Sequence, residues 1–140
     1  MKLVKSYKPL LAWFLILLLG LTAVASISSS LELDPKIASL LITNTVSILL
    51  VGLMLIIYRT QRIYYINYVT YKEAAALTEE KRKRFAYQHL MAFMSSMILF
   101  AFYTVISILI KIPMMLDVTV FAVLLIVTAI RTVPFNIKDK

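Results

Sequence analysis

Four long stretches of the chain are apolar at nearly every position, and polar residues separate them. Each stretch has about 20 residues or more, enough for a helix that crosses ~30 Å of hydrocarbon. Side chains that are apolar on every face of a helix are typical of a segment surrounded by lipid. The pattern predicts transmembrane helices over residues 7–28, 37–58, 89–110 and 114–133. We therefore expect an all-α integral membrane protein, a four-helix bundle that forms one membrane domain over residues 1–140.

The first apolar stretch shares some features with a signal peptide. Lys2, Lys5 and Lys8 precede or begin it, and the Ala-Val-Ala sequence at residues 23–25 would suit a cleavage site. The apolar run continues past this site to Ser28. We therefore expect the stretch to be retained as the first membrane helix.

Three small residues on the first predicted helix form a candidate packing patch. Gly20, Ala23 and Ser26 follow one another at three-residue spacing, so they lie at neighbouring positions on the helix surface. Small side chains at helix contacts in membranes let two backbones approach closely. We expect helix packing at this patch, with chance placement of small residues as the alternative.

Few polar side chains lie inside the apolar stretches, and Asn44 is the one that most needs a partner. Serine and threonine hydroxyls can bond to a carbonyl of their own helix, whereas a buried amide has more hydrogen-bonding groups to satisfy. Ser96 and Tyr103 share a face of the third stretch. We expect these three residues to make contacts between helices, with a ligand contact at Asn44 as the alternative.

Proline and aspartate mark the expected helix boundaries. Asp34 followed by Pro35 predicts a helix start, with the aspartate as N-cap and the proline at the first helical position. Pro113 is expected to begin the fourth helix and to place Asp117 in its first turn, near the membrane surface. Pro134 is expected to end that helix.

The polar segment at residues 59–88 connects the second and third apolar stretches, and it contains neither glycine nor proline. Three tyrosines in it recur at helical spacing: Tyr64, Tyr68 and Tyr71. This spacing predicts that the second helix continues beyond the lipid and carries one aromatic stripe. Thr78 followed by two glutamates predicts the start of the third helix. We therefore expect a helical hairpin that projects from the membrane.

The basic residues indicate how the chain crosses the membrane. Of the 15 lysines and arginines, all but Lys36 and Lys111 lie near the termini or in the polar segment. Loops that stay in the cytosol carry an excess of lysine and arginine. We expect both termini and the hairpin in the cytosol, in a bacterial cytoplasmic (inner) membrane.

Six basic residues of the polar segment are candidates for contact with anionic lipid headgroups or with an acidic protein partner. They are Arg59, Arg62, Lys81, Arg82, Lys83 and Arg84. Because the run at residues 81–84 lies next to the predicted bilayer, we expect no nucleic acid as a partner.

The composition excludes several kinds of chemistry. The chain has no cysteine, which excludes disulfides and zinc–thiolate sites, and its 2 glycines make a phosphate-binding loop implausible. The single histidine, His89, has no acidic cluster beside it and makes a poor metal site. No carboxylate lies in the middle of an apolar stretch, where ion-coupled transporters usually place one. We expect no enzymatic activity, no cofactor and no metal.

These observations favour a non-catalytic accessory or assembly subunit of a larger membrane complex, which would bind membrane lipids and a protein partner or a second copy of the chain. The alternative is a homo-oligomeric channel or an uncoupled small-solute transporter, in which the polar residues of the second and third helices line a path. A defence or immunity protein would carry the same pattern as the first class.

Overall fold

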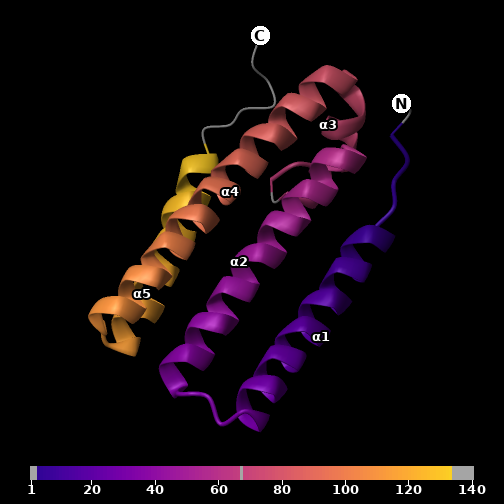
Figure 1. Cartoon of the computed structure of the whole chain (residues 1–140). Helices are drawn as coiled ribbons and strands as arrows, with labels where there is room; N and C mark the ends of the chain where they lie inside the picture. The colour runs from indigo at the N-terminus through magenta and orange to yellow at the C-terminus, as the bar shows by residue number, and fades with distance from the viewer. Residues whose placement is uncertain (1–2, 67, 134–140) are drawn as a thin grey trace.

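The computed structural model of the chain describes residues 3–66 and 68–133. The helices in this part of the chain are α1 (Lys8–Ser30), α2 (Pro35–Thr60), the 3₁₀ segment η1 (Ile63–Tyr65), α3 (Tyr71–Ala76), α4 (Glu79–Ile110) and α5 (Met114–Thr132) (Figure 1). Four of them, α1, α2, α4 and α5, are each long and apolar enough to cross a membrane. This confirms the expectation of four such helices. Pro134, which was expected to end the last one, lies outside the described residues.

Helix α2 lies between α1 on one side and the α4–α5 pair on the other (Figure 1). In the most apolar stretch of α1 none of the residues is buried, against 22% in that of α2. The three helices α2, α4 and α5 contact one another, whereas α1 packs mainly on α2. The four helices are therefore not equivalent members of a bundle, since α1 lies at the edge of a three-helix core.

The helix starts follow the local sequence. Asp34 Oδ1 accepts a hydrogen bond from the amide of Lys36 at 2.9 Å, and Pro35 occupies the first turn of α2. Thr78 caps α4 through the amide of Lys81. These caps satisfy amides that have no partner within their own helix, which is why short side-chain acceptors recur at helix starts.

The segment between α2 and α4 differs from the expected continuous helix. Helix α2 ends at Thr60 because Gln61 adopts a left-handed conformation with φ 56°. Tyr68 is also left-handed, with φ 69°, so the chain turns twice before it reaches α3. The part of the segment that leads into the third apolar stretch is a long helix, because α4 starts at Glu79 and continues without interruption into its apolar part. The expectation that α2 continues with one aromatic stripe is wrong.

Residues 61–66 and 68–78, called the cap below, cover one end of the helix core (Figure 1). Ser6 contacts the cap through Tyr64, and Thr132 contacts it through Tyr68, so the N-terminal segment and the last turn of α5 lie at this same cap end. The short connections at residues 31–34 and 111–113 lie at the opposite end, called the turn end.

Candidate functional site

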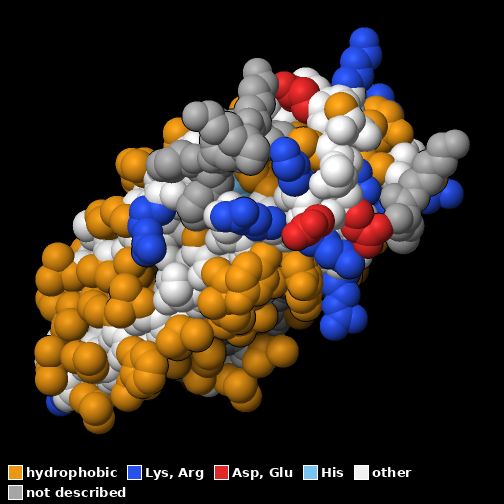
Figure 2. Space-filling model, turned by 90° about the horizontal axis from the view of Figure 1, so that it is seen from above, with side chains coloured by type: hydrophobic (Ala, Val, Ile, Leu, Met, Phe, Trp, Pro, Cys, Tyr) orange, Lys and Arg blue, Asp and Glu red, His pale blue; other side chains and the backbone are white. Residues whose placement is uncertain are grey.

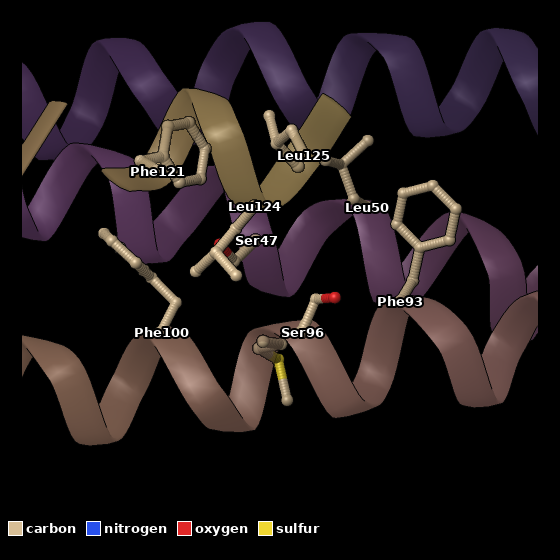
Figure 3. Close-up of a pocket in the computed structure, with 9 residues that line it drawn as sticks. Ser47, Leu50, Phe93, Ser96, Phe100, Phe121, Leu124 and Leu125 are labelled. Atoms are coloured by element: carbon tan, nitrogen blue, oxygen red, sulfur yellow. The ribbon is translucent and has the colours of Figure 1, made fainter. Parts of the chain in front are cut away.

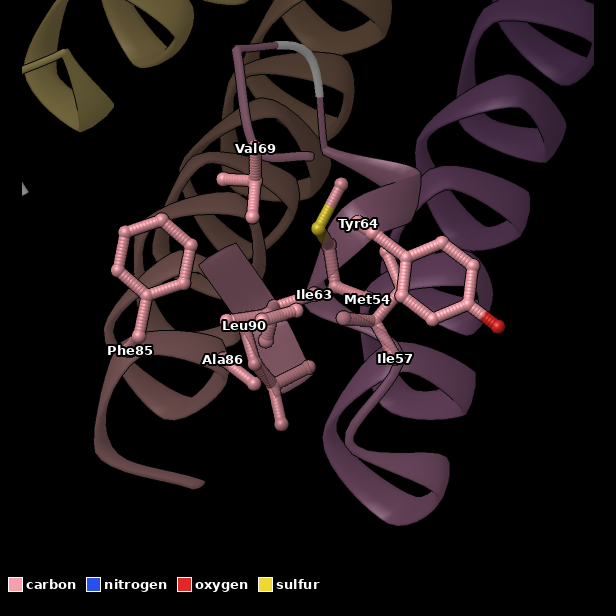
Figure 4. Packing of buried hydrophobic residues seen from close by; sticks show 9 residues of the cluster. Met54, Ile57, Ile63, Tyr64, Val69, Phe85, Ala86 and Leu90 are labelled. Carbon is pink, nitrogen blue, oxygen red and sulfur yellow. The ribbon is translucent and has the colours of Figure 1, made fainter. Parts of the chain in front are cut away.

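The cap shares one hydrophobic core with the cap-side halves of α2 and α4. Side chains from α2, η1 and α4 converge in this core (Figure 4). The residues with the lowest exposure are Ile57 at 1%, Ile63 and Ala74 at 0%, and Ala86 at 1%. Burying a side chain of the size of isoleucine contributes about 1.5–3 kcal/mol. The cap is therefore a folded part of the protein with its own buried residues.

Tyrosine hydroxyls tie the N-terminal segment to the cap. The Tyr64 hydroxyl donates to the carbonyl of Ser6 at 3.0 Å and accepts from its amide at 3.0 Å. Tyr65 donates to the same carbonyl. Tyr71 donates to the carbonyl of Leu3 at 3.0 Å. Because three tyrosines satisfy backbone groups of an extended segment, that segment is held against the cap without regular secondary structure of its own.

A fourth tyrosine connects the cap to α4 and α5. The Tyr68 hydroxyl lies 3.2 Å from Nε2 of His89 and 3.3 Å from the carbonyl of Thr132. The other ring nitrogen of His89 lies 3.0 Å from the carbonyl of Phe85, which can only accept, so in the neutral ring Nδ1 carries the proton and the Tyr68 hydroxyl shares its single hydrogen between Nε2 and the carbonyl of Thr132. Burial raises the pKa of Tyr68, and burial together with the neighbouring Tyr64 raises that of Tyr65. Both phenols therefore stay protonated donors at neutral pH.

The Arg82 side chain is buried inside the cap, although the residues beside it in the sequence are charged. Its side chain donates to Gln61 at 3.3 Å and to the carbonyls of Leu77 and Ala74. Gln61 in turn donates to Glu79 at 3.1 Å. Arg82 is 5% exposed, whereas Lys81, Lys83 and Arg84 are exposed. The structure therefore separates Arg82 from the other candidate contact residues of the 81–84 run.

The length of α5 shows how far the cap stands from the apolar part of the molecule. Its 19 residues span about 29 Å, close to the ~30 Å of a bilayer's hydrocarbon. The hydroxyls of Ser96 and Thr128 are hydrogen-bonded, so these positions of the antiparallel α4 and α5 are level. Thr132 of α5 and Ala92 of α4 each lie four residues nearer the cap end than this bonded pair, so they are level with each other. Helix α4 extends about 20 Å beyond that level, because it begins at Glu79.

The exposed basic residues of α4 stand well beyond the Ala92 level. Counted along the helix from Ala92, Arg84 lies about 12 Å and Lys81 about 17 Å further out. The headgroup layer on each side of the hydrocarbon is only about 5–8 Å thick. We call Lys81, Lys83 and Arg84 the upper basic tier. One surface ion pair, between Lys83 and Glu79 at 3.1 Å, involves this tier within the described residues.

A second set of exposed basic residues lies close to the Ala92 level. Arg131 is next to Thr132 in the last turn of α5. Asn44 of α2 bonds to Thr104 of the antiparallel α4, so these two positions are level. Counted along both helices from this pair toward the cap end, Arg59 is level with His89, which lies about 5 Å beyond Ala92. The indole of Trp13 in α1 bonds to the carbonyl of Leu49 in α2, so these two positions are level. Counted along the helices from this pair, Lys8 lies within about 3 Å of the Ala92 level. We call the set Lys8, Arg59 and Arg131 the basic rim; all three are exposed. Seen onto the cap end, lysine and arginine side chains lie around and on top of the apolar body (Figure 2).

A buried polar cluster lies at the turn end, where α2, α4 and α5 meet. Asp117 is 1% exposed and accepts from Tyr103 at 2.9 Å and from Ser107 at 2.6 Å. Lys36 donates to the carbonyls of Ser107 and Ile112, at 2.7 Å each, and its Nζ lies 4.0 Å from Asp117 Oδ2. Asp117 lies in the first turn of α5, as expected, and it is enclosed there by three helices. Lys36 thus donates hydrogen bonds to carbonyls near the end of α4, and its positive charge compensates the negative charge of the buried carboxylate.

The polar residues in the middle of the helices bond to one another. Asn44 of α2 donates to Thr104 Oγ1 of α4 at 2.9 Å and to the carbonyl of Leu40 at 2.8 Å. Ser96 of α4 is bonded to Thr128 of α5. These contacts lie between helices and take up the side chains that a solute path would have to expose.

The cavity between α2, α4 and α5 is small. Its volume is about 10 Å³, which is close to the space of a single water molecule. Phe93 and Phe100 of α4, Phe121 and Leu124 of α5 and Ser47 of α2 are among the side chains that line it (Figure 3). This cavity therefore has mostly apolar walls and room for about one water molecule.

The predicted patch of small residues on α1 is divided between two environments. A Cβ on Gly20 would lie 3.7 Å from Leu49 of α2, so this glycine is at the α1–α2 contact. Ala23 and Ser26 are exposed. The structure therefore brings one of the three patch residues into helix packing.

The sequence analysis did not identify the roles of Lys36, Gln61 and Asp117. The pairing of Asp117 with Tyr103 had one available signal, since both residues flank the same short turn and lie on helix faces that a tight hairpin brings together. Nothing in the local sequence distinguishes Gln61. Among the described residues, no group of three His, Asp or Glu side chains could hold a metal ion.

Fold and site together define an all-helical protein with four helices able to cross a membrane and a folded basic cap at one end. Searches against protein-family models, curated proteins and solved structures found no match for this chain.

Proposed function

We propose that the protein is a non-catalytic accessory or assembly subunit of a larger membrane complex and that its cap docks an acidic protein partner. The observation that supports this most directly is the upper basic tier. Lys81, Lys83 and Arg84 are exposed on a part of α4 that lies about 12–17 Å beyond the Ala92 level, further out than a headgroup layer of about 5–8 Å, which favours a protein partner over lipid phosphates as their contact. Positive surface charge of this kind steers and orients an acidic partner.

The fixed position of α4 at the level of the upper basic tier supports a docking role. Arg82 and the hydrophobic core of the cap fix α4 at this level, so the exposed cations are presented in a constant arrangement. A partner that binds such a preorganised surface loses less conformational entropy than one that has to order a mobile loop. In this proposal the cap lies in the cytosol of a bacterial cytoplasmic membrane, as the distribution of lysine and arginine favours.

A channel or uncoupled transporter is the weaker proposal. The polar side chains that would line its path, such as Asn44 and Ser96, are hydrogen-bonded between helices. A path between several copies of the chain would have to use the outer faces of the helices, which are mainly apolar.

The test is extraction of tagged full-length protein from its native membrane in mild detergent, with quantification of the proteins that accompany it. The variant Lys81→Gln/Lys83→Gln/Arg84→Gln removes three positive charges from the upper tier. The variant Lys8→Gln/Arg59→Gln/Arg131→Gln removes three from the rim and is the matched control. Each exposed contact of this kind contributes about 0.2–1 kcal/mol, so we expect the upper-tier variant to bind its main partner about 3-fold to 150-fold more weakly, and the rim variant to keep it.

Two outcomes would contradict the proposal. Equal retention of the partner by both variants would exclude the upper tier as the docking surface. Recovery of a homo-oligomer without any other protein would favour the channel, and solute flux in proteoliposomes would then be measured.

A further inference from the structure

We infer that the basic rim (Lys8, Arg59 and Arg131) binds the phosphates of anionic phospholipids in the leaflet at the cap end. The inference is independent of the proposed docking of a protein partner, because it concerns different residues at a different level. Its basis is the separation of the basic residues into a rim near the hydrocarbon edge and a tier beyond the headgroups.

The rim residues have the height that lipid phosphates require. Arg131 is at the edge set by the length of α5, and Arg59 lies about 5 Å beyond it, inside a headgroup layer of about 5–8 Å. Lys8 lies about 3 Å on the hydrocarbon side of the same edge, and its long side chain can extend outward to the phosphates. They belong to three helices, so the cations are spread around the molecule.

An aromatic pair marks the same level. The rings of Tyr58 and Tyr87 lie 6.0 Å apart between α2 and α4, with Tyr87 49% exposed. Tyrosine is enriched where hydrocarbon meets headgroups, because its ring is apolar and its hydroxyl is polar. The position of this pair beside Arg59 supports the assignment of the rim to the headgroup layer.

The rim charges have no partner inside the described protein. Neither Lys8, Arg59 nor Arg131 forms an ion pair or a side-chain hydrogen bond with another described residue. The two arginines lie in the last turns of α2 and α5, where a helix terminus favours a cation, but Lys8 lies in the first turn of α1, where it does not. The shared feature of the three is therefore their level in the membrane. Anionic lipid is favoured over zwitterionic lipid because no carboxylate among residues 3–66 and 68–133 forms an ion pair with these charges.

The experiment measures which lipids the full-length protein retains. Wild-type protein is reconstituted in nanodiscs of phosphatidylcholine with a small fraction of phosphatidylglycerol, and the bound lipids are counted by native mass spectrometry. Each basic residue at the surface favours anionic lipid by about fivefold. Because the three residues lie at separate positions around the molecule, Lys8→Gln/Arg59→Gln/Arg131→Gln should reduce the enrichment of phosphatidylglycerol at each position by about fivefold.

The upper-tier variant Lys81→Gln/Lys83→Gln/Arg84→Gln is the matched control, since it removes the same charge. Its residues lie about 4–12 Å beyond a headgroup layer of about 5–8 Å. Because their attraction to the phosphates is partly screened over this distance, the upper-tier variant should lose clearly less of the enrichment than the rim variant. Equal loss in both variants would show an effect of net charge alone and would overturn the inference, as would a wild-type protein without enrichment. The conservative variant Arg59→Lys should retain the enrichment within about twofold, which distinguishes charge from helix packing.

Discussion

The buried pair of Lys36 and Asp117 makes the most quantitative prediction about this fold. Leucine at position 117 leaves the Lys36 ammonium without its counter-ion and leaves the hydroxyls of Tyr103 and Ser107 without their acceptor. Methionine at position 36 leaves the carboxylate buried without a cation and removes the Lys36 donor from the carbonyl of Ile112, whereas the carbonyl of Ser107 still accepts from the amide of Ile112. Each substitution therefore leaves buried polar groups without the partner that they have in the wild-type protein.

The structure sets the size of these effects. Breaking a buried ion pair by removing one partner costs about 3–5 kcal/mol. Lys36 keeps two carbonyl acceptors and its side chain is 18% exposed, against 2% for Asp117, so we expect about 3 kcal/mol for Asp117→Leu. Lys36→Met should cost more, about 4 kcal/mol, because it leaves the carboxylate unpaired and the carboxylate is the more enclosed of the two groups.

The assay is reversible unfolding in mixed detergent micelles, followed by helical circular dichroism, for both single variants and the double variant. The double variant leaves neither charge alone, so it should be less destabilised than the sum of the singles by about 1–3 kcal/mol. Lys111→Met removes an exposed lysine at the same end and should stay within about 0.5 kcal/mol of wild type. Additive single effects would refute the reasoning that the pair is energetically coupled.

Three further predictions concern the helix contacts and the cap. Asn44→Ala should lower the stability by about 1 kcal/mol in the same assay, and the effect should vanish when Thr104 is already valine. Arg82→Gln should weaken the cap by about 2 kcal/mol and speed proteolysis within residues 61–78, whereas Lys81→Gln should not. Since burial raises the pKa of Tyr65 above 10.0, its contribution to stability is complete below that pH and is lost as the pH rises through the raised value; the phenolate absorbance that Tyr65→Phe removes should appear above pH 10.

The cap illustrates where local sequence information ends. Gln61, where α2 stops, is an ordinary helix former, and no glycine or proline lies near it to indicate a left-handed residue. The spacing of Tyr64, Tyr68 and Tyr71 suits a helix, but each hydroxyl bonds a different partner that is distant in sequence. Tertiary hydrogen bonds and the buried core of the cap outweighed helix propensity here, because propensity differences are below ~1 kcal/mol per residue.

The sequence by itself determined the features that depend on short-range chemistry. Apolar length predicts the four helices able to span a membrane, since every backbone group in lipid must be satisfied inside the helix. Asp34 with Pro35, and Thr78 before its glutamates, predict helix starts because a cap acts within one turn. The requirement that Asn44 find a partner also follows from residue type alone.

Only the tertiary structure decided which identical-looking residues serve different purposes. Lys81 and Arg82 are adjacent basic residues, yet one is exposed and the other lies inside the cap, because successive positions on a helix point about 100° apart and only one of them faces Gln61. Asp117 and Lys36 are far apart in the chain, and their pairing requires α2, α4 and α5 to be packed first. Burial and partnership are properties of three-dimensional neighbours, which the order of residues along the chain does not specify.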